Sequence, residues 1–391
     1  MNIQNYVDKL FLYSLFLLPL ALSTGPFLPD LIVSCIALYM IFNIAYGKKL
    51  YYLKNNISYF FFTFYLYLIF SSLISDHVVF SLKTSLPFLR YYFFTIGVWY
   101  LISTYPSELK KFTYIFLIIF LLALIAGLYQ YIYGETILGT ESTSNRLSLM
   151  FSDRLLMGQF LAKLFPILLA IILVSPFKKK YKYSLFFLLF IATDSIVFIT
   201  GERTALGLVI ISSLFIILFV NQMRYFRVFT LIISFIIILI ISFSNNEIKE
   251  RNIDYTLSQI GVSDEGGQIY IFSKEHDSLI KTSWNIFQDH KIFGVGPNNF
   301  RNYCNNEKYK INDYSCSTHP HNILVQITVE LGIVGLAFYT LLIFYFVRSI
   351  LKQINSQIFK NSPHFSDYQI ILLAAILCSI FPLLPNLNLF N

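Results

Sequence analysis

The segment Ser317-Thr-His-Pro-His-Asn-Ile-Leu-Val-Gln-Ile-Thr-Val-Glu-Leu-Gly-Ile-Val-Gly-Leu336 joins a long polar loop to an apolar run that is long enough to cross a membrane. Within it, Asn322, Gln326 and Glu330 follow one another at intervals of four residues, so a helix would place them on one face. A lipid-facing helix does not carry such a stripe, because an unpaired polar group in hydrocarbon costs several kcal/mol. The segment therefore predicts a helix, starting at His321, whose polar face meets protein or a wet cavity.

Polar groups at that depth are candidates for function, and His319 and His321 lie at the predicted boundary between water and bilayer. A second interpretation stays open for Gln326 and Glu330. They would then only make hydrogen bonds between helices, and Gly332 would let the helices approach closely.

The composition is typical of a protein with many membrane spans. Hydrophobic residues make up 56% of the chain and charged residues 13%, whereas soluble domains carry about 25% charged residues. The mean hydropathy is +0.64. The sequence has no zinc-finger spacing, no clustered basic helix and no aromatic RNA-binding motif, so we expect no nucleic-acid partner.

Windows of about 17 to 22 mostly apolar residues predict membrane-spanning helices along nearly the whole chain. They fall at residues 7–23, 29–46, 57–75, 87–103, 112–132, 156–174, 183–200, 205–220, 228–244, 321–347 and 368–385. We predict an all-α polytopic membrane protein with about 11–12 transmembrane helices and one long, partly helical extracytoplasmic loop.

Positive residues gather in alternate connections between these spans, and the positive-inside rule places those connections and the N-terminus in the cytoplasm. They are Lys48, Lys49, Lys54, Lys110, Lys111, Lys178, Lys179, Lys180, Lys182, Arg224, Arg227, Arg348, Lys352 and Lys360. The loop at 245–320 is then an extracytoplasmic domain between an N-terminal bundle at 1–244 and C-terminal helices at 321–391.

Two cysteines, Cys304 and Cys316, lie in that loop. In an oxidising compartment we expect them to form a disulfide, which contributes about 3 kcal/mol in the chain-entropy model. Two free thiols are the alternative. The loop also has the pattern of a folded segment, because Ser273 to Asp289 has helical periodicity and the glycines of Gly294-Val-Gly-Pro-Asn-Asn-Phe300 allow a tight turn.

Arginines on the predicted external side need a reason, because they oppose the charge bias that orients the chain. Arg203 lies in a tight turn between two spans, and Arg146 lies in an external connection. Converging guanidinium groups suit a phosphate, since each offers a planar pair of donors. The alternative for Arg203 is contact with lipid headgroups. Asp194, inside a span, either pairs with an arginine or makes a structural polar contact.

Three motifs resemble those of the O-antigen ligase and polymerase superfamily. Thr200-Gly-Glu-Arg-Thr-Ala205 resembles its Gly-x-Arg-Thr motif. Trp284-Asn-Ile-Phe-Gln-Asp-His-Lys-Ile-Phe-Gly-Val-Gly-Pro-Asn-Asn-Phe-Arg301 resembles its loop motif. His319-Pro-His-Asn-Ile-Leu324, followed by Glu330-Leu-Gly-Ile-Val-Gly335, resembles its His-Asn-x-x-Leu helix. The motifs occur in the family's order over about 140–385, which implies a GT-C-like fold.

Members of that family act on glycans linked to undecaprenyl pyrophosphate at the outer face of the bacterial inner membrane. The resemblance therefore implies an integral membrane glycosyltransferase at that location. Ligases transfer the glycan to lipid A–core, whereas polymerases extend the glycan; we favour the ligase slightly and leave the polymerase open. The implied partners are the lipid-linked donor, a glycan or lipid A–core acceptor, and membrane lipids.

By position in the motifs, His321 corresponds to the family's essential histidine and Arg203 to its essential arginine. Asn145-Arg-Leu-Ser148 resembles the family's external Arg-x-Ser segment, so Arg146 is a third, weaker candidate. The family often has another arginine before the loop tryptophan, and His276 or Lys281 stands there instead. The substrate-binding candidates are His319, Asn322, His276, Lys281, Trp284, Gln326 and Glu330.

The chemistry that these residues permit is a direct displacement that inverts the anomeric centre. His321 would accept the proton of the acceptor hydroxyl, while Arg203 and Arg146 would stabilise the departing diphosphate. We expect no cofactor and no metal, since the chain lacks the Asp-x-Asp motif of enzymes that use nucleotide sugars. A transporter or flippase of lipid-linked glycans is the alternative, and it would show broken helices and internal repeats.

Overall fold

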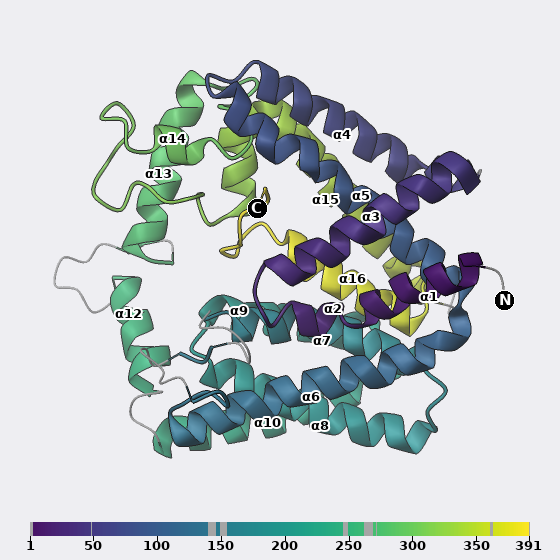
Figure 1. Ribbon diagram of the computed structural model, residues 1–391. Coiled ribbons are helices and arrows are strands. Elements are labelled where there is room, and N and C mark those ends of the chain that lie inside the picture. Colours follow the sequence, from purple (N-terminus) through teal and green to yellow (C-terminus); the bar gives the residue numbers. More distant parts are fainter. Residues whose placement is uncertain are drawn as a thin grey trace. The chain divides into compact units, whose positions relative to one another are not determined.

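The computed structural model describes residues 3–47, 49–139, 146–148, 155–244, 249–261, 269–270, 272–359 and 363–390. All the regular elements in these ranges are helices (Figure 1). The chain divides into two compact units. Unit 1 comprises Met1–Cys35, Val98–Tyr255 and Leu351–Ser379, and unit 2 comprises Ile36–Gly97, Thr256–Ile350 and Ile380–Asn391.

The predicted spans coincide with helices. The N-terminal ones are α1 (Ile3–Phe16), α2 (Leu18–Ala21), α3 (Phe27–Gly47), α4 (Asn56–Leu73), α5 (Val78–Thr104) and α6 (Leu109–Tyr133). The next are α7 (Met157–Val174), α8 (Lys179–Ile199), α9 (Arg203–Phe219), α10 (Arg224–Ser244), α15 (Ile323–Phe359) and α16 (Asp367–Ile380). Within the described ranges, seven helical stretches are long and apolar enough to span a membrane, and α9 and α16 are shorter apolar helices. The chain is therefore an all-α polytopic membrane protein.

Unit 1 contains a bundle of five helices, α6 to α10. In it α8 packs against α6, α7 and α10, and α7 also packs against α9 (Figure 1). Aromatic side chains fill the centre, where the rings of Phe120 and Phe165 stack with centroids 5.9 Å apart. Such helices suit a membrane because each satisfies its own backbone hydrogen bonds.

A buried ion pair crosses this bundle from α8 to α10. Arg227 is 0% exposed and donates two hydrogen bonds of 2.8 Å to the carboxylate of Asp194. The hydroxyl of Ser234 donates to the same carboxylate, at 2.8 Å. The prediction that Arg227 lies in a connection between spans is wrong, because Arg227 lies within α10. Local charge patterns do not reveal this burial, since its partner Asp194 is 33 residues away.

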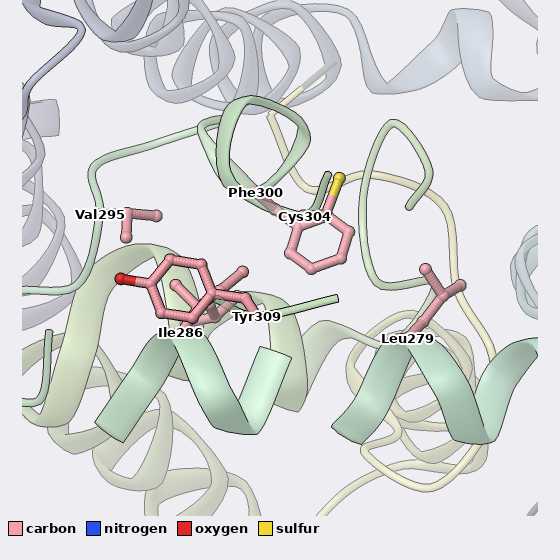
Figure 2. Packing of buried hydrophobic residues seen from close by; sticks show 7 residues of the cluster. Leu279, Ile286, Val295, Phe300, Cys304 and Tyr309 are labelled. Carbon is pink, nitrogen blue, oxygen red and sulfur yellow. The ribbon is translucent and has the colours of Figure 1, made fainter. Parts of the chain in front are cut away.

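In unit 2 the part of the long loop from Phe272 to Pro320 is folded, as predicted. Its helix α13 (Lys274–Asp289) follows an N-cap in which the Ser273 hydroxyl accepts the His276 N–H, at 3.3 Å. The short helix α14 (Phe300–Tyr303) and α13 enclose an apolar core, most of which Figure 2 shows. This core contains Leu279, Ile286, Val295, Phe300, Cys304, Tyr309 and Val329.

Helix α15 is interrupted at Gly332, where φ is 64° and ψ is −162°. Backbone of the loop motif approaches the interruption: the N–H of Val295 donates to the carbonyl of Val329, and the N–H of Gly296 donates to that of Glu330, at 3.1 and 2.9 Å. A side chain at Gly332 would meet the carbonyl oxygen of Ile292 at 2.3 Å. The absence of a side chain at Gly332 therefore allows the backbone of the loop motif, and not only another helix, to approach α15 closely.

Candidate functional site

Three arginines of unit 1 gather beside the Thr200–Ala205 turn, and we call them the guanidinium cluster: Arg146, Arg203 and Arg251. The turn is sharp because Gly201 adopts a φ of 68°, and Arg203 follows as the first residue of α9. The guanidinium carbons of Arg203 and Arg251 lie 6.0 and 5.4 Å from the ring centroid of Tyr255. Both cations thus adjoin one aromatic ring.

Glu202 fixes this turn from inside the unit. Its carboxylate accepts the backbone N–H groups of Gly158, at 2.7 Å, and Gln159, at 3.2 Å, and so caps the N-terminus of α7. Burial raises the pKa of the Glu202 carboxyl to about 6, although both N–H groups and the charge of Arg146 oppose that rise. Glu202, which occupies the variable position of the Gly-x-Arg-Thr motif, therefore holds the turn that carries Arg203.

Arg251 was not among the residues that the sequence predicted. Burial, and then the charge of Arg146, lowers the pKa of its guanidinium, so Arg146 and Arg251 are close enough to repel each other. Arg146 also donates to the carbonyl of Leu155, at 3.1 Å. A concentration of positive charge of this kind is suited to an anion. The feature that could have identified Arg251 is its place on the predicted external side, where arginines are rare.

Three histidines of unit 2 form a second group, which we call the histidine cluster: His276, His319 and His321. The ring centroids of His319 and His321 are 4.1 Å apart, and those of His276 and His321 are 6.0 Å apart. His276 comes from the first turn of α13, so the cluster joins the loop domain to the beginning of α15. All three histidines were predicted as site residues from the sequence, but the sequence did not predict that their rings lie close together.

The predicted helical stripe from His321 needs a correction. Helix α15 begins at Ile323, and Asn322 is its N-cap, with the side-chain oxygen accepting the N–H of Val325 at 3.1 Å. His321 precedes the helix in the left-handed region, with φ at 56°. This conformation is costly for a residue with a side chain, by about 1–3 kcal/mol, and persists only where surrounding contacts hold it. Of the predicted stripe, Gln326 and Glu330 lie within the helix, whereas Asn322 lies at its N-cap.

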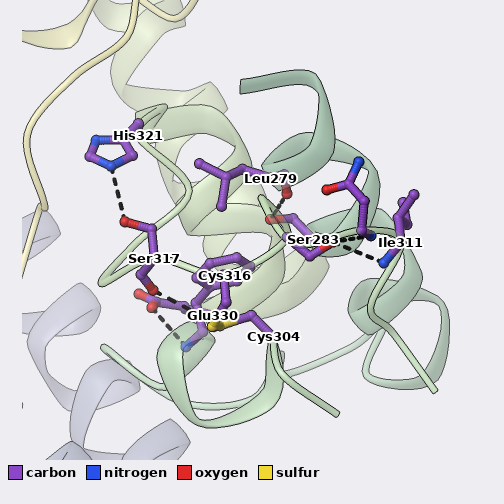
Figure 3. The surroundings of a disulfide bond; sticks show 11 residues. Leu279, Ser283, Cys304, Ile311, Cys316, Ser317, His321 and Glu330 are labelled. Carbon is purple, nitrogen blue, oxygen red and sulfur yellow. Dashed lines mark hydrogen bonds between the residues drawn. A yellow bond between two sulfur atoms is a disulfide. The ribbon is translucent and has the colours of Figure 1, made fainter. Parts of the chain in front are cut away.

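A hydroxyl contacts the candidate base. The Oγ atom of Ser317 lies 3.1 Å from Nε2 of His321, as Figure 3 shows. Burial lowers the pKa of the His321 imidazole, so its neutral form predominates at pH 7. A neutral imidazole that already bonds a hydroxyl group is arranged to accept a proton from one.

His319 has a different environment. Its Nε2 lies 3.1 Å from the carbonyl oxygen of Asn386, which can only accept, so this nitrogen carries the hydrogen. Nδ1 lies 3.0 Å from the hydroxyl of Thr318. Burial, and then the charge of His321, lowers the pKa of His319 to about 4. With both nitrogens engaged, His319 suits positioning more than proton transfer.

The residues at 381–390, which we call the C-terminal segment, hold His319 and His321 in place within unit 2. The N–H of Asn386 donates to the carbonyl of His321, at 2.7 Å. The Asn322 amide donates to the carbonyl of Pro382, at 2.8 Å, and the Gln326 amide donates to the Asn388 side chain, at 2.6 Å. These bonds account for the left-handed conformation of His321.

Gln326 and Glu330 are both 0% exposed and bind protein groups. Gln326 donates to the Glu330 carboxylate at 3.0 Å, and the same carboxylate accepts the N–H of Phe300 at 3.1 Å. These contacts agree with the second interpretation of the sequence, in which Gln326 and Glu330 only make structural hydrogen bonds. Their partners lie in the loop motif as well as in α15. We therefore assign Gln326 and Glu330 a positioning role.

Arg301, the last residue of the loop motif, is a cation that the sequence did not select. Its guanidinium donates to the Asn298 side chain at 2.7 Å, and that oxygen also accepts from the amide of Asn388 at 3.0 Å. Its charge is one of the causes that lower the pKa of His319, so it lies near the histidine cluster. The arginine that the family often has before the loop tryptophan is absent here, and Arg301 lies after that tryptophan.

The other predicted residues are Trp284, Lys281 and the two cysteines of the loop. Trp284 is 57% exposed on α13 beside Phe287, which leaves much of its ring open to solvent. Lys281 forms an ion pair with Asp277, at 2.6 Å, one helical turn away. The Cys304–Cys316 disulfide is present, as predicted, with Cα atoms 4.9 Å apart, and it closes the loop that leads to His319 (Figure 3).

The comparison with protein families covers the histidine cluster and two of the three arginines of the guanidinium cluster. Residues 185–340 match a family model described as O-antigen ligase, and this stretch contains Arg203, Arg251, Arg301 and the histidine cluster. No curated protein gives a match to this chain. The matched stretch begins in α8 and ends in α15. The chain therefore carries an O-antigen ligase domain at residues 185–340, which supports a membrane enzyme similar to the O-antigen ligases and polymerases.

Proposed function

We propose that this enzyme transfers a glycan from undecaprenyl pyrophosphate to an acceptor hydroxyl at the outer face of the inner membrane, with inversion and without a metal. The observation that carries the proposal is the contact of 3.1 Å between a hydroxyl group and the neutral His321 imidazole. The N-terminus would be cytoplasmic and the histidine cluster periplasmic, in agreement with the charges of the connections.

In the proposed reaction the acceptor oxygen attacks the anomeric carbon while Nε2 of His321 takes its proton. The bond from that carbon to the diphosphate oxygen breaks, and undecaprenyl pyrophosphate leaves with the bonding electrons. Arg203, Arg146 and Arg251 stabilise the negative charge that develops on the leaving oxygen. These guanidinium groups supply the positive charge that a divalent cation provides in other transferases, which supports metal independence.

Ser317 has a special place in this proposal, because its hydroxyl occupies the position that an acceptor hydroxyl would take. The rival role is that of a nucleophile, in which the Ser317 oxygen forms a covalent bond to the anomeric carbon and the product retains its configuration. Ser317→Ala should leave most of the transfer activity and an inverted product. Complete loss of transfer, or a product with retained configuration, would favour the nucleophile.

The broken helix α15 is the one observation that favours a transporter, since transporters bind substrates at discontinuous helices. However, the carbonyls of Val329 and Glu330 that precede the break accept N–H groups of the loop motif and so have protein partners. A transporter would still translocate its substrate after His321→Ala, and it would form no new glycosidic bond. The proposed enzyme forms that bond and loses this activity with His321.

The proposal requires that one substrate reach residues of both units. A photoreactive analogue of the lipid-linked donor, with its label on the diphosphate-proximal sugar, should cross-link to peptides that contain Arg203 and to peptides that contain His321. Labelling at one peptide alone would reject the role proposed for the residue in the other peptide. Expression in two hosts, one without its ligase and one without its polymerase, then separates the two activities through a capped core or a ladder of chain lengths.

A further inference from the structure

A pocket of about 540 Å³ lies in unit 1, among residues that the proposed reaction does not use. Four places in the chain line it: the end of α7, the beginning of α8, the connection from α9 to α10, and the beginning of α16. The lysine-rich beginning of α8 belongs to the end of the bundle that the charge pattern predicts to be cytoplasmic. We call it the lysine pocket.

Two ammonium groups line the lysine pocket. Lys182 donates to the carbonyl of Leu173, at 2.6 Å, and retains two further hydrogens on its Nζ. Lys179 places its Nζ 5.9 Å from the ring centroid of Tyr183, another lining residue. Within the part of the chain that the structure describes, neither ammonium forms an ion pair with a carboxylate. The pair is therefore suited to a phosphate group.

The lysine pocket also has an acidic residue, Asp367, at the beginning of α16. The backbone N–H groups of Gln222 and Asn221 lie near its carboxylate. The Oδ2 atom is buried and has no hydrogen-bond partner in the described part of the chain. A buried carboxylate oxygen without a donor is costly, by about 1–3 kcal/mol, so a donor from a ligand would be favourable.

Much of the remaining lining is apolar or aromatic, including Phe177 and Phe186, and its other polar residues are Asn221, Gln222 and Ser366. The pocket is therefore suited to a molecule that has a phosphate, a nearby ammonium with N–H groups, and an apolar part. A glycerol headgroup would supply the phosphate but would bring no cation to Asp367. A choline headgroup would bring a cation that has no N–H to donate.

We propose that the lysine pocket binds the headgroup of an ethanolamine phospholipid. The phosphate lies between the ammonium groups of Lys179 and Lys182, and the ethanolamine ammonium donates to Oδ2 of Asp367. The acyl chains leave along the apolar wall toward the surrounding lipid. A lipid held in this way joins α7, α8 and α16 at one end of the unit 1 bundle.

The test uses the full-length protein in detergent, with short-chain dihexanoyl phospholipids that carry ethanolamine, glycerol or choline headgroups. Binding is measured by native mass spectrometry at increasing lipid concentration. Wild-type protein should bind the ethanolamine lipid roughly tenfold or more tightly than the other two, because of the charge-assisted hydrogen bond. Equal binding of all three lipids would overturn the proposal.

Two variants and a control locate the site. Asp367→Asn should abolish the preference for ethanolamine, and Lys179→Gln should weaken binding of all three lipids. Lys180→Gln is the matched control, because Lys180 is exposed on the same turn of α8 and does not line the pocket. If the control lost as much binding as Lys179→Gln, the lysines would act only as a diffuse positive surface, and the assignment would be rejected.

Phosphoethanolamine without acyl chains distinguishes a lipid site from a site for a soluble anion. The proposal predicts weaker binding of phosphoethanolamine than of the dihexanoyl lipid, since the apolar wall then has no ligand to contact. Equal affinity for the two would reject a lipid as the occupant. These measurements need no glycan transfer, so their outcome is independent of the proposed reaction.

Discussion

The guanidinium cluster of unit 1 and the histidine cluster of unit 2 differ in how they are held. Arg203 and Arg251 adjoin the Tyr255 ring and carry permanent charge. Burial lowers the pKa of both His319 and His321, and the C-terminal segment fixes these two residues through several hydrogen bonds of 2.6 to 3.1 Å. A charge acts over a distance and tolerates movement, whereas a proton transfer requires heavy atoms within about 2.6–3.2 Å. The two clusters therefore suit the leaving group and the acceptor, respectively.

The largest effect is expected from loss of the base. His321→Ala should lower the rate of glycan transfer by about 10²–10⁴-fold, because positioned proton transfer contributes that much. The rate is measured with purified protein and a lipid-linked donor. His364→Ala is the control, because His364 is an exposed histidine outside the cluster. Transfer at more than a tenth of the wild-type rate in His321→Ala would contradict the assigned role.

The next effect tests the guanidinium cluster. Arg203→Ala should reduce kcat about 10²–10³-fold, as for loss of one group that stabilises developing charge. Arg203→Lys should recover only part of that loss, since an ammonium lacks the planar fork. Arg251→Ala should cost about tenfold, in line with one charged hydrogen bond.

Arg348→Ala, at an exposed position on α15, serves as the control for loss of a positive charge. If Arg348→Ala and Arg251→Ala had the same activity, Arg251 would have no place in the cluster. If Arg203→Lys were as active as wild type, bidentate binding of phosphate would be wrong.

A smaller effect is expected from the C-terminal segment. Asn388→Ala removes the side chain that bonds Gln326 and Asn298, at 2.6 and 3.0 Å. We expect about a tenfold lower kcat and an unchanged KM for the donor, because the change displaces the base and not the guanidinium cluster. Leu387→Ala, at the exposed neighbouring position, should leave both constants unchanged. A loss confined to thermal stability would show that the segment has no part in positioning.

The smallest effect concerns pH. Burial lowers the pKa of His321, so the imidazole stays neutral, and active as a base, at pH values below the usual 6.5. The transfer rate should thus be level from about pH 7.5 to 6.5 and fall only as the pH passes through the lowered pKa. The kcat profile of the wild-type protein provides the check. A decline that already begins above about pH 6.5 would contradict the environment described for His321.

The membrane spans and the disulfide could be predicted from the sequence because their causes are local. An apolar run forms a helix wherever it enters a membrane, and Cys304 and Cys316 lie only 12 residues apart. The motifs around Arg203 and His321 also identified the family that the comparison found. The glycines of the loop motif were expected to form a turn, and Gly294 and Gly296 have positive φ angles.

Arg227 shows where such reasoning fails. As a charge three residues into an apolar run, it has the pattern of a helix end near the cytoplasm, and only its contact with Asp194 shows that it is buried. Arg251 and Arg301 were missed for a related reason. Neither belongs to a motif position with a known role, and each gains significance from neighbours that are distant in sequence.

The sequence by itself determined that this chain crosses a membrane many times, that its polar loop folds and is cross-linked, and which histidine and arginine to test. The tertiary structure decided that His321 precedes α15 in a left-handed conformation and that residues more than 60 positions away hold it there. The physical reason is range. Helical periodicity and hydropathy depend on adjacent residues, whereas the geometry of a proton acceptor depends on hydrogen bonds between segments that meet only after folding.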